Sequence, residues 1–239
     1  MTELLYKDDS YIKTFDAAII TVEDENHGVV LDRTAFFPGG GGQPADFGTL
    51  TEQHITFKEK HVKRIDGKFF HIIEGDRLPG LGSQIQGHID WKHRYNLMRT
   101  HTAMHILCGV IFRDYGASVT GGNMEPLKGR MDFEFETMRR ELVDEINAKI
   151  NSEVKQSRPV CWRELPRDEA FQIPDLIRTK INLLPKGIKQ VRVVEIDGLD
   201  LQADGGTHVR NTSEVGIIRV ADYKSKGKIN KRIYLELDS

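Results

Sequence analysis

The hydrophobic pattern of this chain changes its period near Trp91, and that change limits the folds open to it more than any other feature. Before it, from about Lys7, short runs alternate apolar and polar residues between turn residues, as in DAAIITVEDENHG and GKFFHIIEGD. Such alternation predicts half-buried strands, and therefore a small β-barrel or sandwich. From Trp91 to about Asp114 apolar residues recur at spacings of three and four, which predicts a core helix.

The rest of the chain predicts a second helix among strands. A turn is expected at Gly121–Gly122 before the strand MDFEFE, and a turn at Asp197–Asp200. Further strands are expected at PVCWREL, VRVVEI, EVGIIRVADYK and NKRIYLEL, and a proline-marked stretch from Pro166 to Pro185. The second helix is expected from about Met138 to Gln156, with inward residues Leu142, Ile146, Ile150 and Val154.

This order predicts an α+β fold in two domains. Residues 1–90 are expected to form a small N-terminal β-barrel domain that carries a glycine-rich loop. Residues 91–239 are expected to form an α+β core in which helices pack on an antiparallel sheet. A chain of 239 residues is long enough for two such domains.

Composition narrows the classes of function. The cysteines Cys108 and Cys161 cannot form a disulfide framework, and the start MTELLYKDDS lacks the layout of a secretion signal, so we expect a reducing cytoplasm. Both thiols are expected to pack in the core. The apolar run Met104–Phe112 is too short to cross a bilayer, and no membrane role is expected.

The formal net charge is −2, but basic residues gather locally. Either of two clusters could contact phosphates, with a solvated surface as the alternative. One cluster, at the start of the first helix, contains Lys92, His93, Arg94 and Arg99. The other, near the C-terminus, contains Lys224, Lys226, Lys228, Lys231 and Arg232.

Two segments carry residues suited to binding a metal. His101 and His105 lie four apart, so their imidazoles share one helical face, although two ordinary core histidines would show the same spacing. The intervening TAM lacks the glutamate of the HExxH peptidases. Asp204 and His208 bracket a glycine turn and offer a carboxylate and an imidazole, both zinc ligands, with an ordinary turn as the alternative.

Four motifs together resemble a known family. They are TAFFPGGGGQPADFG, RTHTAMHIL, ADGGTHVRNTSEVG and YKSKGKINKRI, and they span most of the chain. The set resembles the editing module of alanyl-tRNA synthetases and of their stand-alone relatives, the alanyl-tRNA editing (AlaX) proteins. The order of the motifs and the preceding small β-domain resemble the medium-length class.

The resemblance implies a zinc site. His101, His105 and His208 take the ligand positions of the family's HxxxH and GGTH motifs. The family pattern has a cysteine where this chain has Asp204, so the implied site combines three histidines with one carboxylate, a harder and less thiophilic donor set. One Zn²⁺ per chain is the cofactor expected. Zinc could polarise an ester oxygen, activate water, or anchor the substrate.

The resemblance also implies a reaction, the hydrolysis of serine or glycine from mischarged tRNA(Ala). A pocket built for alanine discriminates against serine or glycine by only about 1–3 kcal/mol, so a second, editing site is needed. The glycine loop resembles the family's substrate-facing segment. Thr34 and Gln43 flank it and are expected to recognise the serine hydroxyl, unless Thr34 merely continues a strand. The backbone amides of Gly40, Gly41 and Gly42 are expected to stabilise an oxyanion.

Under this interpretation the basic residues contact the acceptor stem of tRNA(Ala). The residues expected to do so are Arg94, Arg99, Lys226, Lys228, Lys231 and Arg232. Two other functions stay open. The chain could be a zinc hydrolase of small esters or amides, which would not need tRNA, or a catalytically silent tRNA-binding module with a structural metal.

Overall fold

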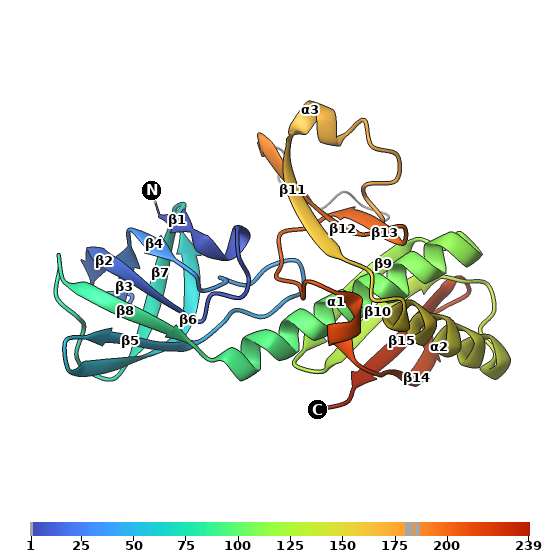
Figure 1. Cartoon of the computed structure of the whole chain (residues 1–239), viewed down its shortest axis with the longest axis horizontal. Helices are drawn as coiled ribbons and strands as arrows, with labels where there is room; N and C mark the ends of the chain where they lie inside the picture. Colours follow the sequence, from blue (N-terminus) through green and yellow to red (C-terminus); the bar gives the residue numbers. More distant parts are fainter. Residues whose placement is uncertain (1, 180–183, 185–186) are drawn as a thin grey trace. The chain divides into compact units, whose positions relative to one another are not determined.

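The computed structural model describes residues 2–179, 184 and 187–239, and it confirms the α+β fold (Figure 1). The chain divides into two compact units, Met1–Tyr95 and Asn96–Ser239. The division falls inside helix α1 (Trp91–Tyr115), so the first turn of this helix belongs to the barrel unit. The domain boundary predicted between residues 90 and 91 lies at the start of the same helix and stays a prediction.

The N-terminal unit is built around a closed antiparallel barrel in the order β2–β3–β7–β6–β5–β8. The sequence of strand β2 explains how such a barrel acquires a core: its residues alternate between exposed and buried, with Phe15, Ala17 and Ile19 directed inward. Two short strands, β1 and β4, pair beside the barrel. The strands are β1 (Glu3–Leu4), β2 (Thr14–Glu23), β3 (Gly28–Leu31), β4 (Arg33–Thr34), β5 (Gly48–Glu52), β6 (Ile55–Ile65), β7 (Lys68–Glu74) and β8 (Gln84–Ile89).

The barrel interior holds two ionisable side chains among its apolar ones. His71 and Glu59 are both fully buried, and His71 Nδ1 lies 3.8 Å from Glu59 Oε1. The ring of Phe36 meets the imidazole edge-on, with centroids 5.4 Å apart. Burial lowers the pKa of His71 to about 3 and raises the pKa of Glu59 well above its usual value. At neutral pH the imidazole of His71 is therefore uncharged, and burial favours the uncharged form of Glu59.

The second unit packs helices on an antiparallel sheet in the order β14–β15–β10–β9. Helix α2 lies against this sheet, where Asn151 Nδ2 donates to the Ile218 carbonyl at 2.7 Å. A separate sheet has the order β11–β12–β13. The elements after α1 are β9 (Val119–Glu125), β10 (Lys128–Glu134), α2 (Arg140–Lys155), β11 (Val160–Pro166), α3 (Arg167–Ala170), β12 (Gln190–Ile196), β13 (Asp200–Ala203), β14 (Ile218–Ser225) and β15 (Asn230–Leu237).

The turn predicted at Gly121–Gly122 is wrong, because β9 runs straight through both glycines. The chain reverses instead at Leu127, whose φ is 63°. Gly122 on β9 and Gly129 on β10 allow close packing against α1: a Cβ on Gly122 would lie 3.3 Å from Met104 Cε, and one on Gly129 would lie 3.0 Å from Met104 Sδ. Small residues in the sheet thus make room for the helix.

Several finer predictions also need correction. Leu142 is only half-buried, and its neighbour Val143 takes the inward position on α2. Cys161 is exposed rather than packed in the core, because β11 lies at the edge of its sheet, whereas Cys108 is buried as expected. Strand β13 already begins at Asp200.

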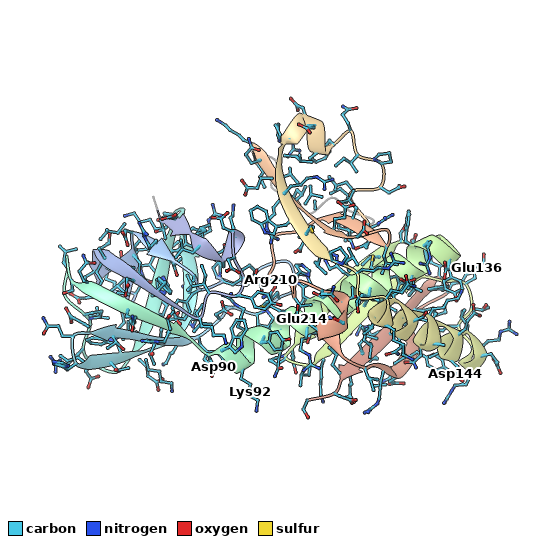
Figure 2. All side chains as sticks on the ribbon, viewed as in Figure 1. Asp90, Lys92, Glu136, Asp144, Arg210 and Glu214 are labelled. Atoms are coloured by element: carbon cyan, nitrogen blue, oxygen red, sulfur yellow. The ribbon has the colours of Figure 1, made fainter. Side chains whose placement is uncertain are left out.

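The strand predicted at EVGIIRVADYK starts too early: its first two residues, Glu214 and Val215, belong to a 3-10 helix, Thr212–Val215, and β14 begins at Ile218. Within this 3-10 helix, Glu214 Oε1 accepts at 3.1 Å from the backbone N–H of Arg210, which precedes the helix; both residues are labelled in Figure 2. Of the proline-marked stretch, Pro185 lies outside the described residues. Across the part of the chain that the structure describes, no helix is long and apolar enough to span a membrane.

Candidate metal centre

Helix α1 presents two of the candidate ligands. His101 and His105 are separated by about one helical turn on the face that packs into the second unit, and both are buried. Their ring centroids lie 5.1 Å apart. The spacing of four therefore does bring two imidazoles together inside the protein.

Strand β13 and the loop after it present the other two. Side chains two apart on a strand share a face, which groups Asp200, Gln202 and Asp204 on one side. The loop then turns at its glycines, where Asp204 Oδ2 accepts from the Gly206 N–H at 2.8 Å, and this turn delivers His208. Arg192 braces the loop, since its Nη1 donates to the Gly206 carbonyl at 3.0 Å.

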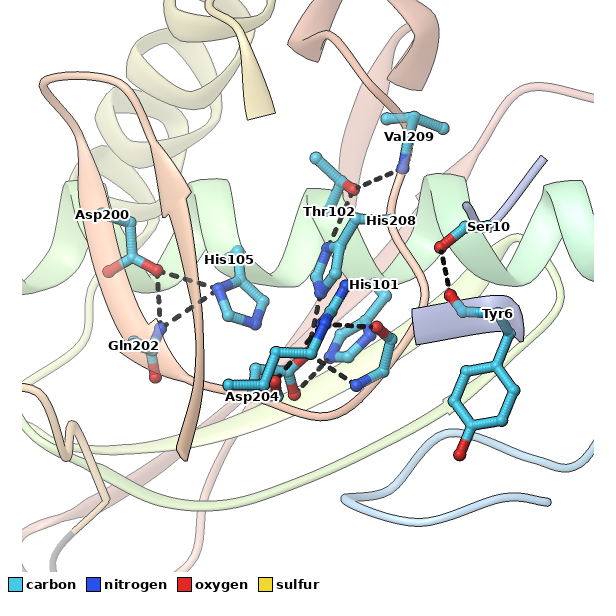
Figure 3. A network of polar contacts seen from close by, with 12 residues as sticks. Tyr6, Ser10, His101, Thr102, His105, Asp200, Gln202, Asp204, His208 and Val209 are labelled. Atoms are coloured by element: carbon cyan, nitrogen blue, oxygen red, sulfur yellow. Dashed lines mark hydrogen bonds and ion pairs between the residues drawn. The ribbon is translucent and has the colours of Figure 1, made fainter. Parts of the chain in front are cut away.

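The four predicted ligands meet in one cluster (Figure 3). One ligand atom from each of His101, His105, Asp204 and His208 lies within 4.8 Å of every other. His208 Nε2 is 2.9 Å from Asp204 Oδ2, and His101 Nε2 is 3.6 Å from Asp204 Oδ1. The rings of His101 and His208 stack with centroids 4.2 Å apart. Residues far apart in the sequence thus converge on one buried point.

A second layer of polar groups orients two of the imidazoles (Figure 3). Asp200 Oδ2 lies 2.9 Å from His105 Nδ1, and Gln202 Nε2 donates to the same carboxylate oxygen at 2.6 Å. On the other side, Thr102 Oγ1 lies 3.2 Å from His208 Nδ1. These contacts occupy the Nδ1 atoms and leave Nε2 of each ring for the centre of the cluster.

The electrostatics of His101, Asp204 and His208 favour the forms that bind metals. Burial lowers the pKa of His101 well below its usual value and that of His208 to about 4. The pKa of Asp204 lies well below its usual value, because the surrounding histidines outweigh the opposing effect of burial. Burial also acts to lower the pKa of His105, but the hydrogen bond and charge of Asp200 raise it overall. At neutral pH Asp204 is therefore a carboxylate and His101 and His208 are neutral imidazoles, whereas Asp200 favours the protonated form of His105.

These residues fit a zinc ion. Imidazole nitrogen and carboxylate oxygen are both zinc donors, and bonds of about 2.0–2.1 Å in a tetrahedron hold ligand atoms about 3.3 Å apart. The observed span of 4.8 Å is close enough for small side-chain shifts to close it. The carboxylate on His105 Nδ1 is the usual outer partner of a metal-bound histidine.

The residues predicted to meet the substrate lie in the other compact unit, Met1–Tyr95. Thr34 is fully buried, and its Oγ1 accepts from the Phe36 N–H at 3.1 Å. The backbone of Gly40 pairs with that of Gln43 in both directions, at 3.0 and 2.9 Å, and the Gln43 side chain is buried. This pairing leaves Gly41 and Gly42 exposed at the tip, with φ of 59° and 90°. The positive φ values explain why glycine is used there.

Arg94 and Asp46 tie the base of this glycine loop together. The Arg94 guanidinium is fully buried in an ion pair with Asp46, and its Nε lies 2.9 Å from each carboxylate oxygen. The same guanidinium donates to the carbonyls of Ala35 and Ser10, at 2.6 and 2.9 Å. Asp46 Oδ2 also accepts from the Phe37 N–H at 2.6 Å. The expectation that Arg94 contacts tRNA is therefore corrected, because its donors are used inside the protein.

Other basic residues of the two clusters also have structural partners. Arg99 donates to the carbonyls of Val215 and Asp238, and the Lys231 amine donates to carbonyls of its own hairpin. Arg232 is paired with Asp132 through contacts of 2.6 and 2.7 Å. The exposed members are Lys92, which projects from α1 in Figure 2, and Lys224, Lys226 and Lys228.

Sequence reasoning missed the supporting residues of the cluster. The sequence predicts a turn at Asp200, and it does not single out Thr102, Gln202 or Arg192. One available signal was the alternation of Asp200, Gln202 and Asp204 at every second position, which places three polar side chains on one strand face. Thr102 and Arg192 carry no comparable pattern, because their partners are distant in the sequence.

Family models match two parts of the chain. The model of the threonyl and alanyl tRNA synthetase second additional domain matches residues 191–234, which include Asp204 and His208. The model of the class II (A) tRNA synthetases matches residues 10–93, which cover most of the barrel unit.

Similar proteins match nearly the full length of the chain. An alanyl-tRNA editing protein AlaX-M of Methanosarcina barkeri is 38% identical over 99% of both chains, and that of Saccharolobus solfataricus is 40% identical over 98% of both. The alanine–tRNA ligase of Pyrobaculum calidifontis is 36% identical over 92% of this chain, which corresponds to 25% of the ligase. With this similarity along its full length, the chain belongs to the AlaX-M family of alanyl-tRNA editing proteins.

Proposed function

We propose that this protein is a trans-editing hydrolase that removes serine from Ser-tRNA(Ala), and also glycine from Gly-tRNA(Ala), at a zinc-containing site. The observation that carries the proposal is the buried cluster of His101, His105, Asp204 and His208, in a chain whose relatives are named alanyl-tRNA editing proteins. The name of those relatives supports the substrate class. The donor set of the cluster supports the metal.

The reaction is the hydrolysis of the ester between the aminoacyl group and the terminal ribose. Zinc bound by the four side chains would supply a Lewis acid, able to polarise an ester oxygen or a water molecule. The protein's own residues hold the ligands in place: Asp200 orients His105, and Arg192 braces the loop that carries Asp204. The exposed amides of Gly41 and Gly42 are the proposed donors to the developing oxyanion.

Selectivity for serine is assigned to Thr34 and Gln43. The Thr34 hydroxyl uses an oxygen lone pair to accept from the Phe36 N–H, and this bond leaves its own proton available to donate. A site that hydrogen-bonds the serine hydroxyl rejects alanine, because alanine would leave the buried polar groups unpaired. The correctly charged Ala-tRNA(Ala) is therefore spared.

Contact with the tRNA backbone is assigned to Lys226 and Lys228. Both are exposed in the connection between β14 and β15, where the Lys231 amine closes the turn by donating to the Gly227 and Lys228 carbonyls. Exposed amines on a braced hairpin suit phosphate binding, which is electrostatic and independent of sequence.

The deciding experiment measures serine release from Ser-tRNA(Ala), with Ala-tRNA(Ala) as the control substrate. Wild-type protein is compared with chelator-treated protein and with His105→Ala, while His61→Ala, at an exposed position, serves as the matched variant. We expect rapid release of serine alone, lost on chelation and in His105→Ala, and unchanged in His61→Ala. Circular dichroism checks that each variant is folded.

Two outcomes would overturn the proposal. Binding of Ser-tRNA(Ala) without release of serine would leave a tRNA-binding module with a structural metal. Equal hydrolysis of a small seryl ester and of Ser-tRNA(Ala) would indicate a general ester hydrolase.

A further inference from the structure

The face of the β11–β12–β13 sheet that carries the cluster extends to an exposed tryptophan. Trp162 on β11 lies directly opposite Val194 on β12, and Val194 lies directly opposite Gln202 on β13. Residues opposite one another in antiparallel strands project from the same face. Trp162 therefore points to the same side of the sheet as Gln202, which contacts Asp200 and His105.

Arg192 physically links the indole to the ligand loop. Its guanidinium carbon lies 5.3 Å from the centroid of the Trp162 ring, within the range of a cation–π contact. Its Nη1 donates to the carbonyls of Gly206 and Asp204, at 3.0 and 3.3 Å. One buried arginine thus fixes the position of the indole relative to a candidate metal ligand.

Trp162 is nevertheless open to solvent. Its exposure is 39%, whereas Arg192 and Val194 on the same face are 8% and 1% exposed. Leaving so large an aromatic surface in water forgoes the stabilisation that burial would give. A rigid, accessible indole beside a positively charged side chain is suited to stacking on a flat π-system such as a nucleobase.

The distance also matches a nucleoside. Neighbouring strands lie about 4.8 Å apart, so Trp162 and Gln202, two strands apart, are separated by about 10 Å. The ester that an editing enzyme cleaves is attached to the terminal ribose of the tRNA, and the terminal base is attached to that same ribose. When the ester carbonyl lies at the cluster, the base must lie within one nucleoside of it.

We propose that Trp162 stacks on the terminal adenine of the aminoacyl-tRNA and thereby positions the ester at the cluster. This inference rests on the proposed function and assigns a binding subsite to it. Stacking on an aromatic side chain is worth about 1–3 kcal/mol per base, which corresponds to about a 5- to 150-fold change in binding. Trp162 acts through the base and does not touch the reacting atoms.

The test compares two substrates that share the seryl ester, 2′(3′)-O-seryl-adenosine and seryl methyl ester. Trp162→Ala is expected to raise KM for the adenosine ester about 5- to 150-fold with kcat little changed, and to leave the methyl ester unaffected. Trp162→Phe, which keeps a flat ring, is expected to restore most of the loss. Phe171→Ala is the matched control, because Phe171 is equally exposed at 40%.

A binding measurement separates this inference from the proposed function. The trinucleotide CCA is expected to quench the fluorescence of the wild-type protein, and this quenching is expected to disappear in Trp162→Phe. If wild-type protein releases no serine, the proposed function fails, and the quenching still tests the subsite. If serine is released but the KM of Trp162→Ala is unchanged, or if CCA quenches Trp162→Phe as strongly as wild type, the stacking role of Trp162 is refuted.

Discussion

Replacing Asp46 with asparagine removes the negative charge from the buried ion pair at the base of the glycine loop. The guanidinium of Arg94 then stays inside the barrel unit without a counter-charge, because its carbon chain and its bonds to the carbonyls of Ala35 and Ser10 hold it there. The asparagine side chain keeps one oxygen that can accept from the Phe37 N–H. The substitution therefore removes the charge while it keeps nearly the same side-chain size and shape.

The expected loss of stability is large. Removing one partner of a buried ion pair costs about 3–5 kcal/mol, because the remaining charge is neither solvated nor paired. Domains of this kind are stable by about 5–15 kcal/mol in total. The Asp46→Asn variant is therefore expected to lose about a fifth or more of the stability of the unit Met1–Tyr95.

Urea unfolding followed by fluorescence measures this loss. In a Trp162→Phe background Trp91 is the remaining tryptophan, and it reports on the barrel unit because its ring stacks on Tyr95 at 5.5 Å. The matched control is Asp16→Asn, at an exposed position on β2, where a change within about 0.5 kcal/mol is expected. Removing both charges in Asp46→Leu/Arg94→Met should recover much of the stability. A loss in Asp46→Asn no larger than in Asp16→Asn would refute the reasoning.

Two further predictions concern other buried groups. Asp200→Asn is expected to weaken zinc binding about 10- to 100-fold, since it removes the carboxylate that orients His105. Competition with a chromophoric chelator measures the affinity, and the control Asp197→Asn, at an exposed position, should bind zinc as wild type does. Equal affinities would contradict the role of Asp200. Burial lowers the pKa of His71 from 6.5 to about 3, so protonation favours the unfolded chain. The contribution of neutral His71 to the free energy of unfolding is therefore complete above about pH 6.5 and is lost as the pH falls towards 3. Between pH 7 and pH 5, urea unfolding should show that wild type loses about 2 kcal/mol more free energy of unfolding than His71→Gln, because each pH unit below 6.5 costs about 1.36 kcal/mol. Equal losses in wild type and His71→Gln, or an equally reduced loss in the exposed control His54→Gln, would contradict this role of His71.

Local patterns were enough to predict the main elements, whereas the ligand set also needed the family resemblance. The spacing of apolar residues along Trp91–Tyr115 predicts α1 because a helix repeats every 3.6 residues, and the same geometry puts His101 beside His105. The contact of these two histidines with Asp204 and His208 depends on the tertiary structure. It was predictable only because the two motifs resemble those of a known family. Alternation likewise predicted the barrel strands, since one side of each strand is buried.

Sequence patterns of charged and small residues gave wrong predictions where the residue that each one contacts is remote in the sequence. Arg94 reads as a surface residue because arginine is seldom buried, but its counter-charge, Asp46, lies 48 positions away. Gly121 and Gly122 together predict a turn because glycine favours turns, but both lie within β9, and Gly122 makes room for Met104 on a neighbouring helix. Periodicity carries no information about such contacts.

The order β11–β12–β13 also bears on how this protein behaves at high concentration. The barrel strands close on one another within the described residues, whereas β11 has one side without a neighbouring strand in its sheet, a template on which another chain could add. The run Val-Cys-Trp would favour such pairing, but Arg163 and Glu164 follow it directly and Pro166 ends the strand. These two charged residues and the proline oppose the addition of another strand at this edge. Replacing Arg163 and Glu164 with β-branched residues is therefore expected to promote self-association through β11.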